Sequence, residues 1–304
     1  MTAPAAVALA AIVLILVVTA AVVGLAWRAS GHAIHPGPAA FAWSLADYPD
    51  LKAEDVEVKS STGVTLAGRF FPGRSPATVV LTHGYGGSQD ELLPTADALH
   101  KGGLSVFTYD LRGCGRSTGE VTFGDKEQED LRSVVDYLAR RDDVDDQRIG
   151  ALGFSMGAAT TLMEAAKDPR IKAVVDDSGW SDVYHWLRPS WSAVFIHPGD
   201  SFSALSLKLA EWRTGTDLDD LKPREDVPDL AGRPLLIIHG TADDNVPPGD
   251  SKENFAAARE PKELWLIDGA AHGATVEPGG PSASERVVSF FRDALSAGGE
   301  GSAG

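Results

Sequence analysis

The segment Gly153–Gly157, with the sequence GFSMG, constrains the fold of this chain more than any other feature. The residues before it, Arg148–Leu152, have the apolar character of a short buried strand. The residues after it, Ala158–Ala166, read as a helix with small residues in its first turn. A Gly-x-Ser-x-Gly sequence in this setting places the serine on a sharp turn above the N-terminus of the helix. The free N–H groups of that helix can stabilise a developing oxyanion, so we predict that Ser155 is a nucleophile.

A serine hydroxyl is a poor nucleophile near neutral pH, so it requires a general base, which in turn requires an orienting carboxylate. The ends of two later strands supply candidates. The apolar strand Pro234–His239 ends in a glycine and is followed by Asp243, and the strand Glu263–Asp268 is followed by His272. Sites of this kind use the chain order serine, acid, histidine, with each residue after a strand. We therefore predict that Ser155, Asp243 and His272 form a catalytic triad.

An oxyanion hole is expected from the exit of an earlier strand, Thr78–Thr82. The sequence that follows, HGYGG at residues 83–87, contains three glycines, which let the backbone approach a substrate without side chains in the way. We predict that the backbone N–H groups of Tyr85 and of Met156, the residue after the nucleophile, form the hole.

With these motifs in place, the chain from about Asp55 to Leu295 resembles the α/β-hydrolase superfamily. It is most similar to the branch of esterase-, lysophospholipase- and serine-aminopeptidase-like members, some of which are tethered to membranes. The resemblance implies an α/β-hydrolase fold: a mostly parallel eight-stranded sheet with helices on both faces and a small helical cap. It also implies a serine hydrolase that cleaves an acyl ester, thioester or amide bond through an acyl-enzyme, while leaving the substrate open.

The alternation of strand and helix patterns independently predicts a mostly parallel sheet covered on both faces, with the active residues at the carboxyl ends of strands. The first two strands are expected to form a hairpin across the turn at residues 61–63. The predicted strands are 56–60, 64–71, 78–82, 104–109, 149–154, 173–177, 235–239 and 263–267, and the predicted helices are 91–101, 125–141, 156–167, 251–259 and 282–295.

Other residues could replace members of the predicted site. Asp244 adjoins Asp243, although the spacing from the glycine exit favours Asp243, and Asp176 or Asp177 ends a strand after which some hydrolases carry the acid. We expect His83 and His239, at strand ends before glycine, to bond local backbone groups instead of acting as the base.

The segment from Ser181 to Arg233 interrupts the alternation and is rich in aromatic residues, so we predict that it forms the cap above the serine. It can line an apolar pocket for an acyl chain or an apolar side chain, with Trp180, Trp186 and Trp191 as candidate substrate-binding residues. Alternatively, its aromatic residues only attach a helical insert to the domain. Both interpretations remain open.

Composition excludes several classes of partner and cofactor. The formal net charge of −16 argues against binding nucleic acid or an anionic surface. The single Cys114 excludes an intramolecular disulfide and a cysteine-rich zinc site. Without a His-x-x-x-His pair or a phosphate-binding loop that carries a lysine, we predict no metal and no cofactor. The expected substrate is a small or lipid-like acyl compound, and the oligomeric state does not follow from the sequence.

The segment Ala5–Trp27 is uncharged and almost entirely apolar. As a helix it is roughly 30 Å long, enough to cross a bilayer core. Because it lacks the basic start and the shorter apolar core of a cleaved signal peptide, we predict a single-pass anchor over residues 1–29. Arg28, directly after the run, favours a cytoplasmic catalytic domain. We expect a tether at 30–54, the hydrolase domain at 55–297 with its cap at about 181–233, and a disordered tail at 298–304.

Two other functions are compatible with such a fold. The first is a catalytically silent binding protein, because a fold alone does not imply activity. The combination of elbow, triad and oxyanion loop argues against it. The second is cofactor-free haloperoxidase chemistry, which proteins of this fold also carry out. Dehalogenation is excluded, because it requires an aspartate at the position of Ser155. We therefore predict a carboxylesterase-, lipase- or peptidase-like hydrolase.

Overall fold

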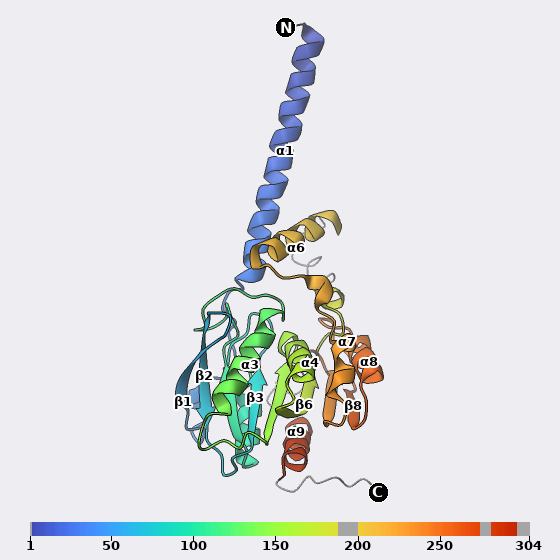
Figure 1. The fold of residues 1–304 in the computed structure, drawn as a ribbon. Helices are drawn as coiled ribbons and strands as arrows, with labels where there is room; N and C mark the ends of the chain where they lie inside the picture. Colours follow the sequence, from blue (N-terminus) through green and yellow to red (C-terminus); the bar gives the residue numbers. More distant parts are fainter. Residues whose placement is uncertain (1, 188–199, 274–280, 297–304) are drawn as a thin grey trace.

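The computed structural model describes residues 2–187, 200–273 and 281–296. Its centre is an eight-stranded sheet in the order β1-β2-β4-β3-β5-β6-β7-β8 (Figure 1). β2 runs antiparallel to β1 and β4, and all other neighbouring strands are parallel. The predicted fold is confirmed, and the predicted strands differ from the observed ones only at their ends. The strands are β1 (Glu54–Lys59), β2 (Thr65–Phe71), β3 (Thr78–Thr82), β4 (Ser105–Tyr109), β5 (Ile149–Phe154), β6 (Ile171–Asp177), β7 (Leu235–Gly240) and β8 (Lys262–Ile267).

Helices cover both faces of the sheet because each presents an apolar stripe to it. In one such helix the buried residues Leu131, Val134, Val135 and Leu138 recur at helical spacing. That helix packs on the same face as two others, while the remaining two cover the opposite face. The first face carries α3 (Lys126–Leu138), α4 (Met156–Lys167) and α8 (Pro248–Ala257), and the second carries α2 (Leu93–Lys101) and α9 (Pro281–Ala294).

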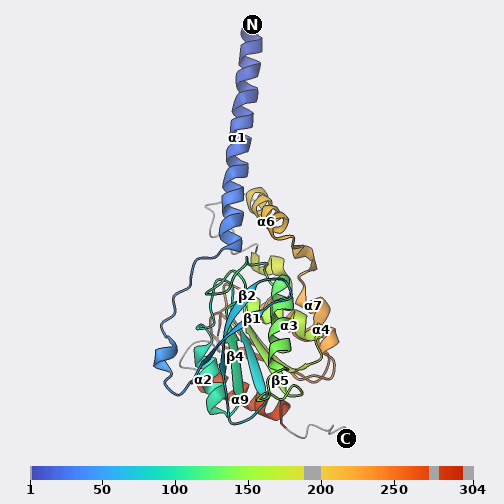
Figure 2. The ribbon, with the colours of Figure 1, turned by 60° about the vertical axis from the view of Figure 1, so that its left-hand side comes forward.

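A single long helix, α1 (Ala3–Ile34), projects from the domain (Figures 1 and 2). The predicted tether is therefore wrong at its start, since residues 30–34 are helical. The reason lies in small residues at the end of the apolar run and just after it: Ala26, Ala29 and Ala33 recur at helical spacing and are buried against the protein. The helix ends just before His35, because the residue preceding a proline is disfavoured in helical conformation.

Residues 36–53 run along the outside of the domain to β1 (Figure 2). As expected, this segment is a loop with one short helix, η1 (Leu45–Asp47). The Trp43 side chain donates a hydrogen bond from Nε1 to the carbonyl oxygen of Asp90 at 2.8 Å, and Leu51 is buried. The segment therefore contacts the domain between Trp43 and Leu51, whereas residues 37–40 are exposed.

The described parts of the insert after β6 contain helices, as predicted. Residues 183–187 form a helical turn, and the part of the insert described beyond it begins with α6 (Asp200–Thr214), which lies beside the lower end of α1 (Figures 1 and 2). The chain then returns to the sheet through η2 (Leu218–Asp220), α7 (Pro223–Asp226) and η3 (Val227–Leu230). The predicted tail, 298–304, lies outside the described residues.

Candidate active site

The turn between β5 and α4 holds Ser155 in an unusual backbone conformation, with φ 55° and ψ −120°. Residues other than glycine rarely adopt a positive φ, and such strain concentrates at functional sites. Two glycines make the turn possible. A Cβ atom on Gly153 would lie 2.2 Å from the carbonyl oxygen of Gly157, and one on Gly157 would lie 2.2 Å from that of Thr82. The GFSMG sequence thus forms a strand–turn–helix junction in which strand and helix approach very closely.

Ser155 and the two residues predicted to assist it lie side by side. The Ser155 hydroxyl donates to Nε2 of His272 at 2.9 Å, and Nδ1 of His272 lies 2.6 Å from Oδ2 of Asp243. The partners assign the tautomer, because Nδ1 must carry the proton to bond a carboxylate and Nε2 must then accept. The Phe154 ring packs against the imidazole with the ring centroids 5.0 Å apart. The arrangement allows proton transfer from the hydroxyl to the histidine.

Asp243 is buried and is surrounded by hydrogen-bond donors. Burial by itself raises the pKa of its carboxyl group, but hydrogen bonds from His239 and His272 outweigh burial and hold that pKa well below its ordinary value. The backbone N–H groups of Asn245 and Val246 also donate to Oδ1, each at 2.9 Å. The carboxylate is therefore ionised at neutral pH and fixed in position.

The rival acids lie in different settings. Asp244 is exposed on the surface of the loop. Asp176 is fully buried, its Oδ1 accepts a hydrogen bond from the N–H of Gly179 at 2.8 Å, and burial raises its pKa to about 6. Asp177 accepts a hydrogen bond from the Ser178 hydroxyl at 2.9 Å. Oδ2 of Asp243 lies 2.6 Å from Nδ1 of His272, which favours Asp243 as the orienting acid.

His239 contributes to the site in a way that the sequence did not indicate. Its Nε2 lies 3.0 Å from the carbonyl oxygen of Val246, which is the expected backbone contact, but also 3.0 Å from Oδ2 of Asp243. Nδ1 bonds the hydroxyl of Ser251. Burial lowers the pKa of this imidazole. The hydrogen bonds to Asp243 and to the Val246 carbonyl together outweigh burial, so the pKa is raised above its ordinary value. The carboxylate is thus held between two histidines.

The loop after β3 passes directly over the nucleophile. A Cβ atom on Gly84 would lie 3.2 Å from the Phe154 ring and 3.4 Å from Cβ of Ser155, so only glycine fits there without displacement. The backbone of Gly84 is held from both sides. Its N–H donates to Oε2 of Glu91 at 2.8 Å, and its carbonyl oxygen accepts from Nδ1 of His83 at 2.7 Å. This loop carries the N–H of Tyr85, whose role in an oxyanion hole with Met156 stays a prediction.

His83 bonds local backbone groups, as the sequence predicted, and both of its ring nitrogens have a backbone partner. The N–H of Leu111 donates to its Nε2 at 2.9 Å, so Nε2 must be the unprotonated nitrogen. Burial lowers the pKa of His83 to about 4, which keeps the imidazole neutral at physiological pH. A neutral ring satisfies both backbone partners, whereas an imidazolium would lose the bond from Leu111.

The three tryptophans predicted to bind substrate fall into different environments. The ring of Trp186 packs edge-on against that of Tyr85, with the centroids 5.3 Å apart, and so lies next to the oxyanion loop. Trp180 is completely buried in the core on the α3–α4 face, so its side chain offers no surface to a ligand in this structure. Trp191 lies outside the described residues. Trp186 remains a candidate for lining the substrate site.

Glu91 combines burial with contact to the oxyanion loop. Burial raises the pKa of its carboxyl group to about 7, although the Gly84 N–H and the nearby His272 each lower it. Since this pKa lies above that of the unfolded chain, the folded state binds the proton more tightly. The free energy of unfolding therefore falls as the pH rises from about 4.5 through 7.

We expect Glu91→Gln to remove this pH dependence, because an amide oxygen can still accept from the Gly84 N–H and carries no charge. The stability of the variant relative to the parent should rise between pH 5 and pH 8 by on the order of 1–3 kcal/mol. Unfolding of the detergent-solubilised protein at both pH values measures the difference. Glu57→Gln, at an exposed position of β1, is the control and should show no such trend. An equal stability change at both pH values would contradict the prediction.

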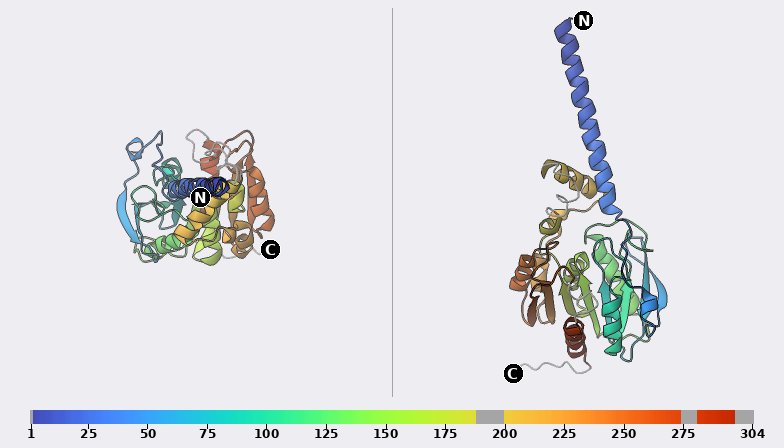
Figure 3. Two further views of the ribbon diagram at one scale, coloured as in Figure 1. Left: turned by 90° about the horizontal axis from the view of Figure 1, so that it is seen from above. Right: turned by 180° about the vertical axis from the view of Figure 1, so that it is seen from behind.

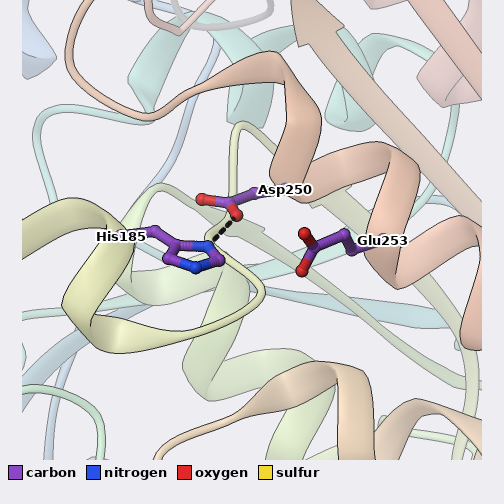
Figure 4. A group of neighbouring side chains, drawn as sticks. All are labelled: His185, Asp250 and Glu253. Atoms are coloured by element: carbon purple, nitrogen blue, oxygen red, sulfur yellow. Dashed lines mark hydrogen bonds and ion pairs between the residues drawn. The ribbon is translucent and has the colours of Figure 1, made fainter.

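Among the residues that the structure describes, one further group has side chains of the kind that bind metals: His185, Asp250 and Glu253, whose ligand atoms lie within 4.8 Å of one another (Figure 4). Nδ1 of His185 lies 2.6 Å from Oδ1 of Asp250. The Ser181 hydroxyl lies 2.7 Å from the same oxygen and 2.8 Å from Oε2 of Glu253, so it bridges the two carboxylates. Arg224 pairs with Glu253 at 3.4 Å. With a hydroxyl between the carboxylates and a guanidinium beside them, the group is a polar cluster that joins the cap to α8.

Known proteins resemble this chain in sequence and in fold. Residues 70–213 match the X-Pro dipeptidyl-peptidase (S15) family. The uncharacterized protein YfhR of Salmonella typhi is 29% identical over 278 residues, which cover 82% of this chain and 84% of YfhR. The uncharacterized protein Rv2307c of Mycobacterium tuberculosis is 30% identical over 226 residues, or 72% of each chain. The esterase Pf2001 of Pyrococcus furiosus has a TM-score of 0.70 and 26% identity, covering 86% of this chain and 100% of the esterase.

The chain belongs to the α/β-hydrolase superfamily. Its family match and structural neighbours show a hydrolase of the esterase- or peptidase-like kind.

Proposed function

We propose that this protein is a serine hydrolase that cleaves an acyl ester, thioester or amide bond through an acyl-enzyme on Ser155. The observation that carries the proposal is the continuous chain of hydrogen bonds from Ser155 through His272 to Asp243, at 2.9 and 2.6 Å. It stands on a strained turn at the carboxyl end of β5, which is where this fold positions a nucleophile.

The geometry suggests the order of events. Oγ of Ser155 attacks the acyl carbon while its proton passes to Nε2 of His272, and the resulting imidazolium is stabilised by ionised Asp243. The oxyanion accepts hydrogen bonds from the backbone N–H groups of Tyr85 and Met156. His272 then protonates the leaving group, and the acyl-enzyme forms as the bond to the leaving group breaks. Water, deprotonated by the same histidine, releases the acid.

Labelling with a fluorophosphonate probe tests the nucleophile directly. The probe forms a covalent bond with a serine only where a base activates that serine and an oxyanion site receives the phosphoryl oxygen. We expect peptide mass spectrometry of the labelled full-length protein to locate the adduct on Ser155, and heat-denatured protein to remain unlabelled. An adduct on a different serine, or native protein that does not react, would remove the basis of the proposal.

We also propose that α1 holds the enzyme in a membrane as a single-pass anchor. The helix is long and apolar enough to cross a bilayer, although a signal sequence passes the same test of length and composition. The contacts at its lower end favour a retained helix, because cleavage after the apolar run would remove Ala26, which is buried against the rest of the protein together with Ala29 and Ala33 of the same helix. Arg28 favours a cytoplasmic domain, and a lipid-like acyl substrate would meet the site at high local concentration.

Carbonate extraction of membranes that contain the full chain tests the anchor. A helix that spans the bilayer should keep the protein in the pellet at alkaline pH, where peripheral proteins are released. The intact mass should match a chain that retains α1. A mature N-terminus beyond residue 20 would identify the segment as a removed leader instead.

A further inference from the structure

The lower end of α1 is joined rigidly to the cap and to the catalytic face. Arg213 of α6 lies over the Trp27 ring at 4.5 Å and contacts the carbonyl oxygen of Trp27 and the Ser30 hydroxyl, each at 3.2 Å. Gly31 leaves space for this guanidinium, since a Cβ atom there would lie 3.1 Å from it. One turn lower, the carbonyl oxygen of Ala33 accepts a hydrogen bond from the Tyr85 hydroxyl at 2.8 Å.

These contacts fix the height of α6 relative to a bilayer. The exposed apolar face of α1 extends from Val7 to Leu25, and 19 residues of helix span roughly 28 Å, close to the thickness of the hydrocarbon core. The boundary between hydrocarbon and headgroups therefore falls at about Trp27. Trp212 of α6 meets Trp27 at this level, with the ring centroids 5.8 Å apart. Figures 1 and 3 show α6 beside α1 and above the rest of the domain, on the side from which the apolar part of α1 extends.

The surface of α6 is unusual for this protein. Among the described residues, the large hydrophobic side chains that are exposed all lie on α1, except Trp212, which is 73% exposed. Trp212 shares one stripe of α6 with the exposed residues Ala204 and Lys208, at intervals of four residues. Tryptophan and basic side chains are enriched where protein meets lipid headgroups, because the indole is amphipathic and the charged groups reach phosphates.

We propose that α6 is a second membrane contact: it lies in the headgroup region of the phospholipid bilayer that α1 crosses, with Trp212 inserted beside Trp27. The strongly acidic protein gains little from anionic lipid, so the contact rests on the indole and operates on zwitterionic phosphatidylcholine. Together with α1 it holds the carboxyl ends of the strands toward the bilayer. The inference rests on the proposed anchor, and it is independent of the proposed chemistry at Ser155.

Nitroxide labels on single introduced cysteines measure the depth of α6 in the full-length protein. The three sites are Ala204→Cys on the exposed stripe of α6, Ile15→Cys in the middle of the apolar run, and Arg292→Cys on an exposed position of α9 at the far end of the domain. The native Cys114 is buried, and the parent protein serves as the unlabelled blank. In phosphatidylcholine nanodiscs, collision rates with oxygen and with a water-soluble nickel chelate report how far each label is from water.

We expect the label at residue 204 to be protected from the nickel chelate at least several-fold relative to residue 292, and residue 15 to be protected most. Trp212→Ala should reduce the protection at 204 and leave that at 15 unchanged, while hydrolysis of a short soluble ester stays the same.

Two results would overturn the inference while the anchor stands: residue 15 buried in lipid with residue 204 as accessible as 292, or dipolar broadening at 204 that shows a second copy of the chain on α6. Exposure of residue 15 would refute the anchor itself. Loss of ester hydrolysis in the parent would bear only on the proposed function.

Discussion

Ser155→Ala and His272→Ala should each lower the turnover of a small acyl ester by on the order of 10⁴- to 10⁶-fold. The hydroxyl and the imidazole form one proton-transfer unit at 2.9 Å, so removing either disables both. For the same reason the double variant should be hardly slower than the worse of the two single variants. Steady-state kinetics with purified protein measure all three, and His32→Ala, on the exposed side of the last turn of α1, is the control.

The pattern of the losses is as informative as their size. If Ser155 and His272 acted separately, the effects of the two substitutions would multiply in the double variant. A His272→Ala enzyme that retains parental turnover would show that another base serves Ser155.

Asp243→Asn should lower turnover by about 10⁴-fold, whereas Asp244→Asn should leave it nearly unchanged. An amide at position 243 can present its N–H to Nδ1 of His272, which favours the tautomer with the proton on Nε2, where the Ser155 proton must arrive. Asp244 is exposed and serves as a matched neighbour of the same chemical type. Comparing kcat/KM for the two variants, with Asp177→Asn as a third, identifies the acid.

The Asp243→Asn enzyme also has a predicted signature in its pH profile. Without an ionised partner the imidazolium is less stable, so the imidazole stays neutral to lower pH and the acid limb of the activity that remains should lie at lower pH than that of the parent. A crippled Asp244→Asn enzyme beside an active Asp243→Asn enzyme would reverse the assignment of the acid.

The sheet and the order of the candidate triad could be predicted because both depend on local patterns. Apolar runs of strand length, each followed by a glycine or a polar turn, locate the strands of a parallel sheet and the edge at which their ends meet. The GFSMG turn is also recognisable from its own sequence. Gly153 is required by the nearby carbonyl oxygen of Gly157, and Gly157 is required by the carbonyl oxygen of Thr82 at the end of the adjoining strand β3.

Contacts between distant segments could not be predicted in this way. The approach of Tyr85 to Ala33, and of Arg213 to Trp27, joins parts of the chain that no spacing relates. The same holds for His239, which reaches Asp243 because of how the loop after β7 folds back. Trp180 illustrates the converse: an aromatic residue next to the insert looks like a pocket residue in sequence, whereas its side chain fills the core.

Because α1 is one unbroken helix from its apolar run to its contacts with the cap, a change in the tilt of the helix also changes the orientation of the domain. Where it crosses a bilayer, its tilt changes with the thickness of the hydrocarbon layer, because a hydrophobic stretch longer than that layer leans over to match it. A flexible linker would absorb such a change, but here the contacts of Tyr85 and Arg213 pass it to the domain. Lipid chain length would then set the angle at which the mouth of the site meets the membrane, so the same enzyme would present a different approach to its substrate in thin and in thick bilayers.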